Sequence, residues 1–142
     1  MKKIEMLQKV QAETYLLLIK THNFHWNVKG PLFQSLHTLF ETQYNELFLA
    51  VDLLAERLKS LENRALGSAE EFLKVSSIKG SCEHKWKKMI KELISDHEQI
   101  IKDFKKLVEL SQKENDEPTA DIAIERIDVH QKHIWMLKSH ID

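Results

Sequence analysis

The sequence has few of the residues that break helices or cross-link chains: three Gly, two Pro and one Cys among 142 residues. A single thiol excludes an intrachain disulfide and a cysteine-rich metal site, and it fits a reducing compartment. The scarcity of Gly and Pro, together with 42% hydrophobic residues, favours a mostly helical chain. At this length we expect a single domain, residues 1–142, that buries roughly two-thirds of its unfolded surface.

Neither sign of charge dominates, because 21 Lys plus Arg stand against 22 Asp plus Glu, a formal net charge of −1. This balance gives no bulk electrostatic argument for a nucleic-acid or membrane partner. Long apolar runs are also missing, and the longest one near the N-terminus is Leu16 to Ile19. The sequence therefore predicts neither a signal peptide nor a transmembrane helix, and a cytoplasmic location is expected.

Apolar residues recur at three- and four-residue steps along four long segments, which predicts four helices. The expected helices cover residues 4–28, 32–61, 82–112 and 119–141. Ser81 is a candidate N-cap of the third helix, and Pro118 suits the opening turn of the fourth. A short helix is expected over residues 69–75, inside the one longer link. Long helices with short links and one longer connection indicate an all-α four-helix bundle with one crossover.

The second expected helix carries His37, Glu41, Asp52 and Glu56 on one face. At 100° per residue their directions fall at roughly 0°, 40°, 60° and 100°. Glu41 and Asp52 are about 16 Å apart along the helix axis, far more than the roughly 2 Å metal–ligand bonds that could join them at one ion. One chain cannot close such a site alone.

The pair His37 and Glu56 has the same midpoint in the sequence as the pair Glu41 and Asp52. If two copies of this helix ran antiparallel across a two-fold axis, His37 would face the partner's Glu56, and Glu41 would face the partner's Asp52. Two identical sites would result, each with imidazole and carboxylate ligands, a set suited to iron, zinc or manganese. His25 would join from the end of the preceding helix.

The other histidines give weaker signals. His22 lies one turn before His25 and suits either a supporting or a structural role. His130, His133 and His140 flank Trp135 and are interpreted as packing or surface residues. The remaining two, His84 and His97, lack a companion ligand at a convincing spacing.

Several blocks of the sequence resemble the Dps proteins, or mini-ferritins, of the ferritin-like superfamily. The matching blocks, in the family's order, are THNFHWNVKGPLFQSLH (21–37), DLLAERL (52–58), ALGSAEEFLKVSSI (65–78) and DEPTADIAIERIDVHQKHIWMLKS (116–139). The resemblance implies a ferritin-like four-helix bundle with the short extra helix in the crossover between helices two and three. It also implies a hollow homo-dodecamer with a ferroxidase site at each two-fold interface.

Carried over residue by residue, the resemblance implies a metal-ligand set shared by two subunits: His25, His37 and Glu41 from one, with Asp52 and Glu56 from its neighbour. This is the pairing that the spacing indicates independently. Glu41 departs from many relatives, which have Asp there, and its extra methylene changes the reach of the carboxylate at the weaker second iron position. The resemblance also places Trp26 beside the site, as a sink for stray oxidising equivalents.

The implied reaction is the oxidation of two Fe(II) per site to Fe(III), preferably with hydrogen peroxide, followed by storage of ferric oxide in the cavity. Such a ferroxidase would protect the cell from oxidative damage, and zinc or another divalent cation can substitute for iron. In the family the start of the fourth helix lines three-fold pores. Here that segment carries Asp116, Glu117 and Asp121, and three copies would form an acidic funnel for iron entry.

Ordinary structural explanations exist for each proposed ligand taken singly. A lone His37 on a bundle face is more often a hydrogen-bonded core residue, and Asp52 and Glu56 are candidates for ion pairs with Arg57 or Lys59. Their shared face, symmetric spacing and family pattern together favour the metal site.

Three alternatives to a mini-ferritin with iron chemistry fit the sequence less well. DNA compaction by relatives commonly uses a mobile basic tail, whereas only Lys2 and Lys3 precede the first expected helix, so we expect weak or absent DNA binding. A purely structural or partner-binding bundle would take up no iron. A larger ferritin is disfavoured because its di-iron site uses Glu-x-x-His motifs inside one bundle, and none of the eight histidines has Glu or Asp three residues before it.

Overall fold

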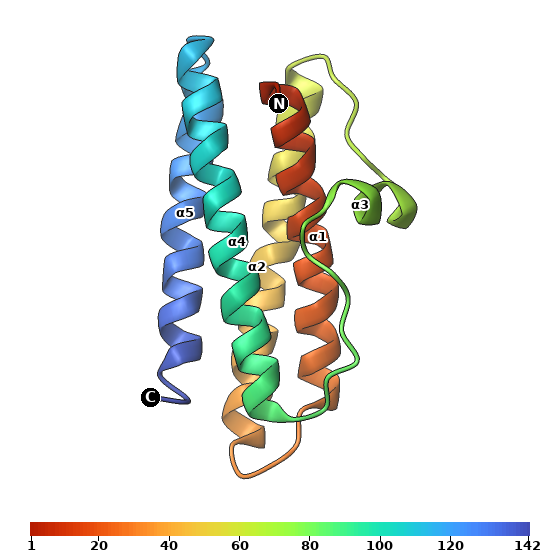
Figure 1. Cartoon of the computed structure of the whole chain (residues 1–142), viewed down its shortest axis with the longest axis vertical. Coiled ribbons are helices and arrows are strands. Elements are labelled where there is room, and N and C mark those ends of the chain that lie inside the picture. The colour runs from red at the N-terminus through yellow and green to blue at the C-terminus, as the bar shows by residue number, and fades with distance from the viewer.

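The computed structural model describes residues 1–142 as five helices without strands (Figure 1). The helices are α1 (Lys3–Asn27), α2 (Phe33–Ser60), α3 (Ala69–Val75), α4 (Trp86–Lys113) and α5 (Glu117–Lys138). The predicted four-helix bundle is confirmed, with α3 in the crossover between α2 and α4. In Figure 1, α1 and α2 form one hairpin and α4 and α5 a second, while α3 packs against the outside of α1.

The apolar stripes of the four long helices meet in one core. Phe24 of α1, Phe40 of α2 and Phe104 of α4 are fully buried there, together with Leu and Ile side chains from the same faces. Burying a large apolar side chain contributes about 1.5–3 kcal/mol relative to leaving it exposed. The bundle therefore draws its stability from the stripes that the periodicity predicted.

The expected start of the third long helix at Cys82, with Ser81 as its cap, is wrong: α4 begins at Trp86. The Ser81 hydroxyl accepts a hydrogen bond from the backbone N–H of Glu83 (3.0 Å). The Glu83 carboxylate accepts from the backbone N–H groups of His84 (2.9 Å) and Lys85 (3.0 Å). These local bonds compete with helix formation. The other predicted boundaries of the long helices lie within three residues of the observed ones.

The turn between α1 and α2 is held against the start of α4. Gly30 has a φ of +117°, which L side chains rarely adopt, and a Cβ placed there would lie 2.9 Å from the Trp86 ring. Glycine is therefore required both by the backbone conformation and by the close approach of the indole.

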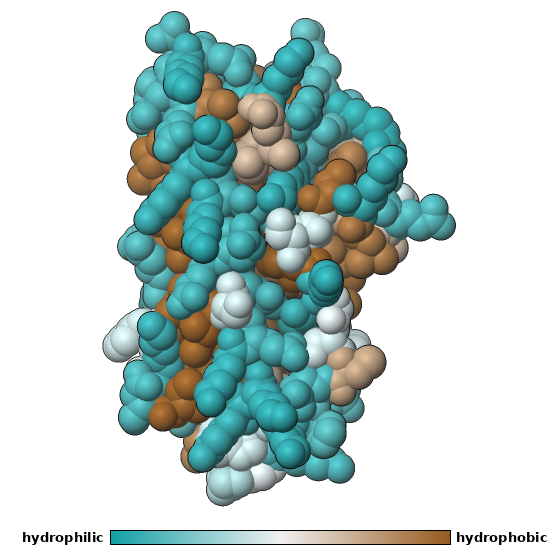
Figure 2. All heavy atoms as spheres, viewed as in Figure 1, coloured by the Kyte–Doolittle hydropathy of each residue, from teal (hydrophilic) through white to brown (hydrophobic).

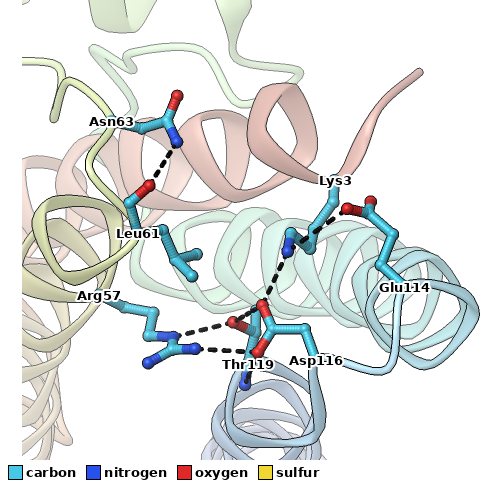
Figure 3. Close-up of polar contacts among 7 residues, drawn as sticks. All are labelled: Lys3, Arg57, Leu61, Asn63, Glu114, Asp116 and Thr119. Carbon is cyan, nitrogen blue, oxygen red and sulfur yellow. Dashed lines mark hydrogen bonds and ion pairs between the residues drawn. The ribbon is translucent and has the colours of Figure 1, made fainter.

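Asp116 links the start of α5 to both α1 and α2 (Figure 3). Its buried carboxylate accepts hydrogen bonds from Lys3 Nζ (2.8 Å) and Arg57 Nη2 (2.9 Å), and from the backbone N–H (3.2 Å) and hydroxyl (2.6 Å) of Thr119. Burial raises the pKa of this carboxyl, but the hydrogen bonds from Lys3 and Thr119 outweigh it and hold the pKa well below its usual range. Asp116 is thus an ionised N-cap of α5.

Glu13 of α1 is fully buried beside α4. Burial, with the neighbouring carboxylate of Asp103, raises its pKa to about 8. Its Oε2 accepts a hydrogen bond from the backbone N–H of Ser77 (2.9 Å), while Lys9 pairs with Asp103 (3.3 Å). Glu13 is consequently mostly protonated near pH 7.

The face seen in Figure 2 is largely hydrophilic over α4, with apolar side chains gathered along the α5 edge and beside α3. The lysines on the outer side of α4 form much of this polar surface, as expected for a solvated face. None of the five helices combines the length and apolar character needed to cross a membrane.

Replacing Asp116 by Ala should lower the free energy of unfolding by about 3 kcal/mol, because the change removes the cap of α5 and leaves Lys3 and Arg57 without their buried partner. Urea denaturation at fixed protomer concentration measures the loss. The matched control is Glu114→Ala, which removes an exposed carboxylate 3.5 Å from Lys3 and should cost less than about 0.5 kcal/mol. Equally small losses in both variants would contradict the assignment.

Candidate metal centre

The imidazole rings of His25, in the last turn of α1, and His37, on α2, stack with their centroids 3.8 Å apart. Each Nδ1 lies 2.7 Å from the backbone carbonyl oxygen of the other residue. A carbonyl only accepts, so each Nδ1 carries the proton and donates it. Each Nε2 is left with a lone pair, which is the tautomer that a metal-binding histidine needs, held by a hydrogen bond from its other nitrogen.

Asp52 and Glu56 lie exposed on α2, one turn apart. A hydrogen bond to Asp52 and the negative charge of Asp52 raise the pKa of Glu56. Two neighbouring carboxylates would both ionise more readily beside a cation. They therefore form an acidic pair suited to binding a positive ion.

The ion-pair alternative for these carboxylates is wrong. Arg57 donates to Asp116 and to the hydroxyl of Thr119 instead (2.9 Å each), and Lys59 takes part in no ion pair. Neither Asp52 nor Glu56 has a Lys or Arg within salt-bridge distance. The single chain leaves their charge uncompensated.

The structure brings His25 to His37 and Asp52 to Glu56, but it does not bring the two pairs together. Glu41 is exposed on α2 one turn after His37. No group of three or more His, Cys, Asp or Glu side chains in the single chain is arranged to hold a metal ion. The chain thus carries two separate halves of the expected ligand set.

Phe33 and Tyr44 lie next to the histidine pair: Phe33 stacks on His37 with the ring centroids 5.0 Å apart, whereas Trp26 contacts only His22 among these rings. The ring of His22 packs between Trp26 (3.8 Å between centroids) and Tyr44 (4.4 Å), and Tyr44 meets His25 edge-on at 5.2 Å. His22 therefore packs against both of these rings, one turn before His25. Tyr44 was missed in the sequence, although it follows His37 by seven residues and so shares its side of α2.

An apolar surface adjoins the carboxylate pair. The exposed side chains on it are Ile19, Phe48, Leu49 and Leu53, each at least 43% accessible. A groove of about 710 Å³ runs among Ile19, Phe48, Leu49 and Phe72, and Asp52 lies in its wall. Contiguous exposed apolar surface of this kind marks a site of protein interaction.

The three acidic residues expected at the start of the last helix differ in exposure. Glu117 and Asp121 are exposed in the first turns of α5, whereas Asp116 is buried and bound by Lys3 and Arg57. Only the first two carboxylates are free to meet a cation from solvent.

His97 has no companion ligand at metal-binding spacing in the sequence, but packing brings it against a histidine of another helix. His97 is fully buried and its Nδ1 lies 2.8 Å from Nδ1 of His130. His130 and His133 are buried, in agreement with the interpretation that they are packing residues rather than surface residues. They also hydrogen-bond with Glu46 and Arg126 in a polar cluster. Only one signal was available in the sequence: His97 falls within the apolar stripe of α4.

The comparisons with known proteins agree on one family. A ferritin-like domain model matches residues 4–142. The DNA protection during starvation protein of Helicobacter pylori is 36% identical over 143 residues, which cover 99% of each chain. The structure of Dps from Thermosynechococcus elongatus superposes with a TM-score of 0.95 at 34% identity, covering 99% of this chain and 90% of that one.

A Dps protein from Vibrio cholerae, described as a member of a broad superfamily of ferritin-like diiron-carboxylate proteins, superposes with a TM-score of 0.94 at 27% identity, covering 99% of this chain and 89% of that one. Domain model, sequence relatives and fold all extend over nearly the whole chain. They confirm what the sequence blocks indicated: this chain belongs to the Dps family, the mini-ferritins of the ferritin-like superfamily.

Proposed function

We propose that this mini-ferritin is a ferroxidase that oxidises Fe(II) to Fe(III), preferably with hydrogen peroxide, and stores ferric oxide inside a hollow homo-dodecamer. Its membership of the ferritin-like diiron-carboxylate superfamily supports iron storage and protection. The observation that carries the proposal is the proton assignment of His25 and His37, whose carbonyl-bound Nδ1 atoms leave both Nε2 lone pairs to bind a metal.

The two half-sites become one site when two subunits meet. Antiparallel pairing of α2 across a two-fold axis would bring His37 and Glu41 of one subunit to the carboxylates at the far end of the other α2. His25 would come with His37, because the two rings are stacked. The exposed apolar side chains beside Asp52 would supply the buried surface that a stable interface requires.

Two irons at one such site would reduce peroxide in a single two-electron step: two Fe(II), H₂O₂ and two protons yield two Fe(III) and two waters. No hydroxyl radical is released, so peroxide and Fe(II) are removed together. Carboxylate ligands favour the harder ferric product, and the small number of protein ligands leaves positions for the oxidant. Trp26 and Tyr44, beside His22 and His25, would donate electrons to stray oxidising species.

Iron would enter the shell past Glu117 and Asp121 at the start of α5. Three copies of these exposed carboxylates would concentrate cations at a three-fold pore. Asp116 would act indirectly, by capping the helix that presents them. The unpaired, exposed thiol of Cys82 fits the expected cytoplasmic location.

Alanine substitution of His25, His37 or Glu56 should lower the rate of peroxide-dependent Fe(II) oxidation by more than about 100-fold, since removing even an outer hydrogen-bond partner of a metal ligand costs about 10–100-fold. The test loads purified protein with Fe(II) anaerobically, adds peroxide, and follows ferric absorbance and particle mass. His84→Ala, at a side chain 83% exposed, is the control and should oxidise iron at the unmodified rate. Full activity in the three variants would refute the ligand set.

Subunit mixing should separate a shared site from a site within one chain. When His37→Ala and Glu56→Ala subunits are denatured and reassembled in equal amounts, half of the two-fold pairs contain one of each. Each mixed pair regains one of its two sites, so about a quarter of the unmodified activity should return. If the site lay within one chain, the mixture would remain as inactive as either variant alone.

DNA binding should be weak at physiological salt. The ammonium group of Lys3 is buried against Asp116, so this lysine is not available to neutralise phosphate groups, which supply most of the nonspecific affinity for DNA. A gel-shift assay near 150 mM salt should show no length-dependent retention, and a lysine-rich N-terminal extension should restore it. Tight retention of the unmodified protein would contradict this prediction.

A further inference from the structure

A second group of ionisable side chains lies inside the bundle. It consists of Glu46 from α2, His97 from α4, and Arg126, His130 and His133 from α5. Glu46 projects from α2 about 180° away from His37, so the group lies on the other side of that helix from the proposed metal ligands. His97 and His130 are fully buried, and Arg126 and His133 are nearly so.

The hydrogen bonds decide where the protons are. Arginine only donates, so Arg126 Nη2 donates to His130 Nε2 (3.1 Å). The proton of a neutral His130 is therefore on Nδ1, which donates to His97 Nδ1 (2.8 Å). The proton of His97 must then be on Nε2, a buried atom without a hydrogen-bond partner. Both imidazoles are neutral, and the bonds run in one direction from Arg126 through His130 to His97.

An added proton would break this chain of bonds wherever it binds. On His97 Nδ1 it would face the N–H of His130 at 2.8 Å, and on His130 Nε2 it would face the guanidinium of Arg126 at 3.1 Å. In either place two donors would oppose each other, with like charges in a buried space.

Little negative charge is available to compensate such a proton. Glu46, from α2, is the only carboxylate in the group, and it already forms a bidentate pair with Arg126 and accepts from His133 Nε2 (2.9 Å). From α1, Glu13 and Lys20 are directed to Asp103 and Asp96 of α4, and no hydrogen bond or ion pair joins α1 to the cluster. The ring of Phe104 closes the remaining side of His130.

We propose that the His97–His130 pair is an acid-sensitive lock, which joins α4 to α5 at neutral pH and releases the bundle in mild acid. The lock is a property of the folded chain and does not depend on the proposed iron chemistry. A protein shell built from these bundles would therefore lose stability in mild acid.

The direction of the pH dependence follows from the burial. Burial is the main reason that the pKa of His97 lies well below 6.5, and the charges of His133 and Arg126 lower it further. Burial likewise lowers the pKa of His130, with smaller contributions from His97 and Arg126. The unfolded chain binds both protons as pH falls through 6.5, while the folded chain does not. Stability is therefore complete above this pH, and below it the unfolding equilibrium constant rises about tenfold per pH unit for each histidine.

Shifted carboxyl groups also contribute to the pH dependence of the unmodified protein, among them Glu13 and Glu46. The pKa of Glu13 is raised to about 8, so the folded chain keeps a proton that the unfolded chain releases above pH 4.5. Protonation of Glu13 therefore adds stability to the folded chain as the pH falls from 8 to 4.5. This gain offsets the loss of stability caused by about one of the two histidines. The pKa of Glu46 is lowered to about 2, so its stabilisation is lost only below pH 4.5. A Glu13→Gln background exposes the effect of the histidines between pH 4.5 and 6.5.

The test compares Glu13→Gln protein with the same protein carrying His97→Gln and His130→Gln, since the amides can hydrogen-bond but do not titrate. Unfolding constants come from urea denaturation at fixed protomer concentration between pH 4.5 and 6.5. The unfolding constant of the protein with both histidines, divided by that of the protein without them, should rise as the pH falls, and its slope should approach about 100-fold per pH unit well below 6.5. All other titrating groups are common to both proteins and cancel. A ratio that does not change with pH would overturn the proposal.

A second measurement serves if the variant with both substitutions does not fold. In the unmodified protein, amide hydrogen exchange corrected for intrinsic rates should lose protection in α4 and α5 before α1 when the pH is lowered from 7 to 5. His84→Gln, at an exposed histidine, should show the same loss, and His97→Gln alone should reduce it. Equal loss of protection in all helices, or no loss, would refute an acid-sensitive lock between α4 and α5.

Discussion

The rigidity of α2 is the constraint from which the proposed chemistry follows. A helix rises about 1.5 Å per residue, so the histidine end and the carboxylate end of α2 cannot approach one another within one chain. The chain therefore folds around its apolar core without closing a metal site. Under the proposed function another subunit completes each half-site, so assembly and iron chemistry depend on the same interface.

The treatment of charge differs between the inside and the outside of the bundle. Asp116 and Glu46, at internal helix contacts, are paired with Lys or Arg, and Glu13 is protonated. Burial makes such compensation necessary, because an unpaired buried charge is costly. Asp52 and Glu56 are exposed and have no cationic partner. Their contrast with the interior carboxylates is what makes them candidates for binding a cation.

The helices were predictable because helical hydrogen bonds are local and the apolar period repeats within each segment. The start of α4 was not, because Ser81 and Glu83 bind nearby backbone N–H groups and delay the helix. The contact between His97 and His130 could not be predicted from the sequence for a different reason. His97 and His130 are 33 positions apart in the chain, and periodicity along one helix does not show which residue of another helix it meets.

The sequence by itself indicated the helical bundle through its apolar spacing and the family through its motif blocks. It also suggested the proposed metal ligands, because a helix converts spacing along the chain into direction in space. Only the tertiary structure decided which nitrogen of His25 and His37 carries the proton, since a carbonyl from a different helix holds each ring. It also decided that Arg57 binds Asp116 and leaves Asp52 and Glu56 uncompensated. These outcomes depend on which atoms of separate helices come within hydrogen-bonding distance, and that is set by packing.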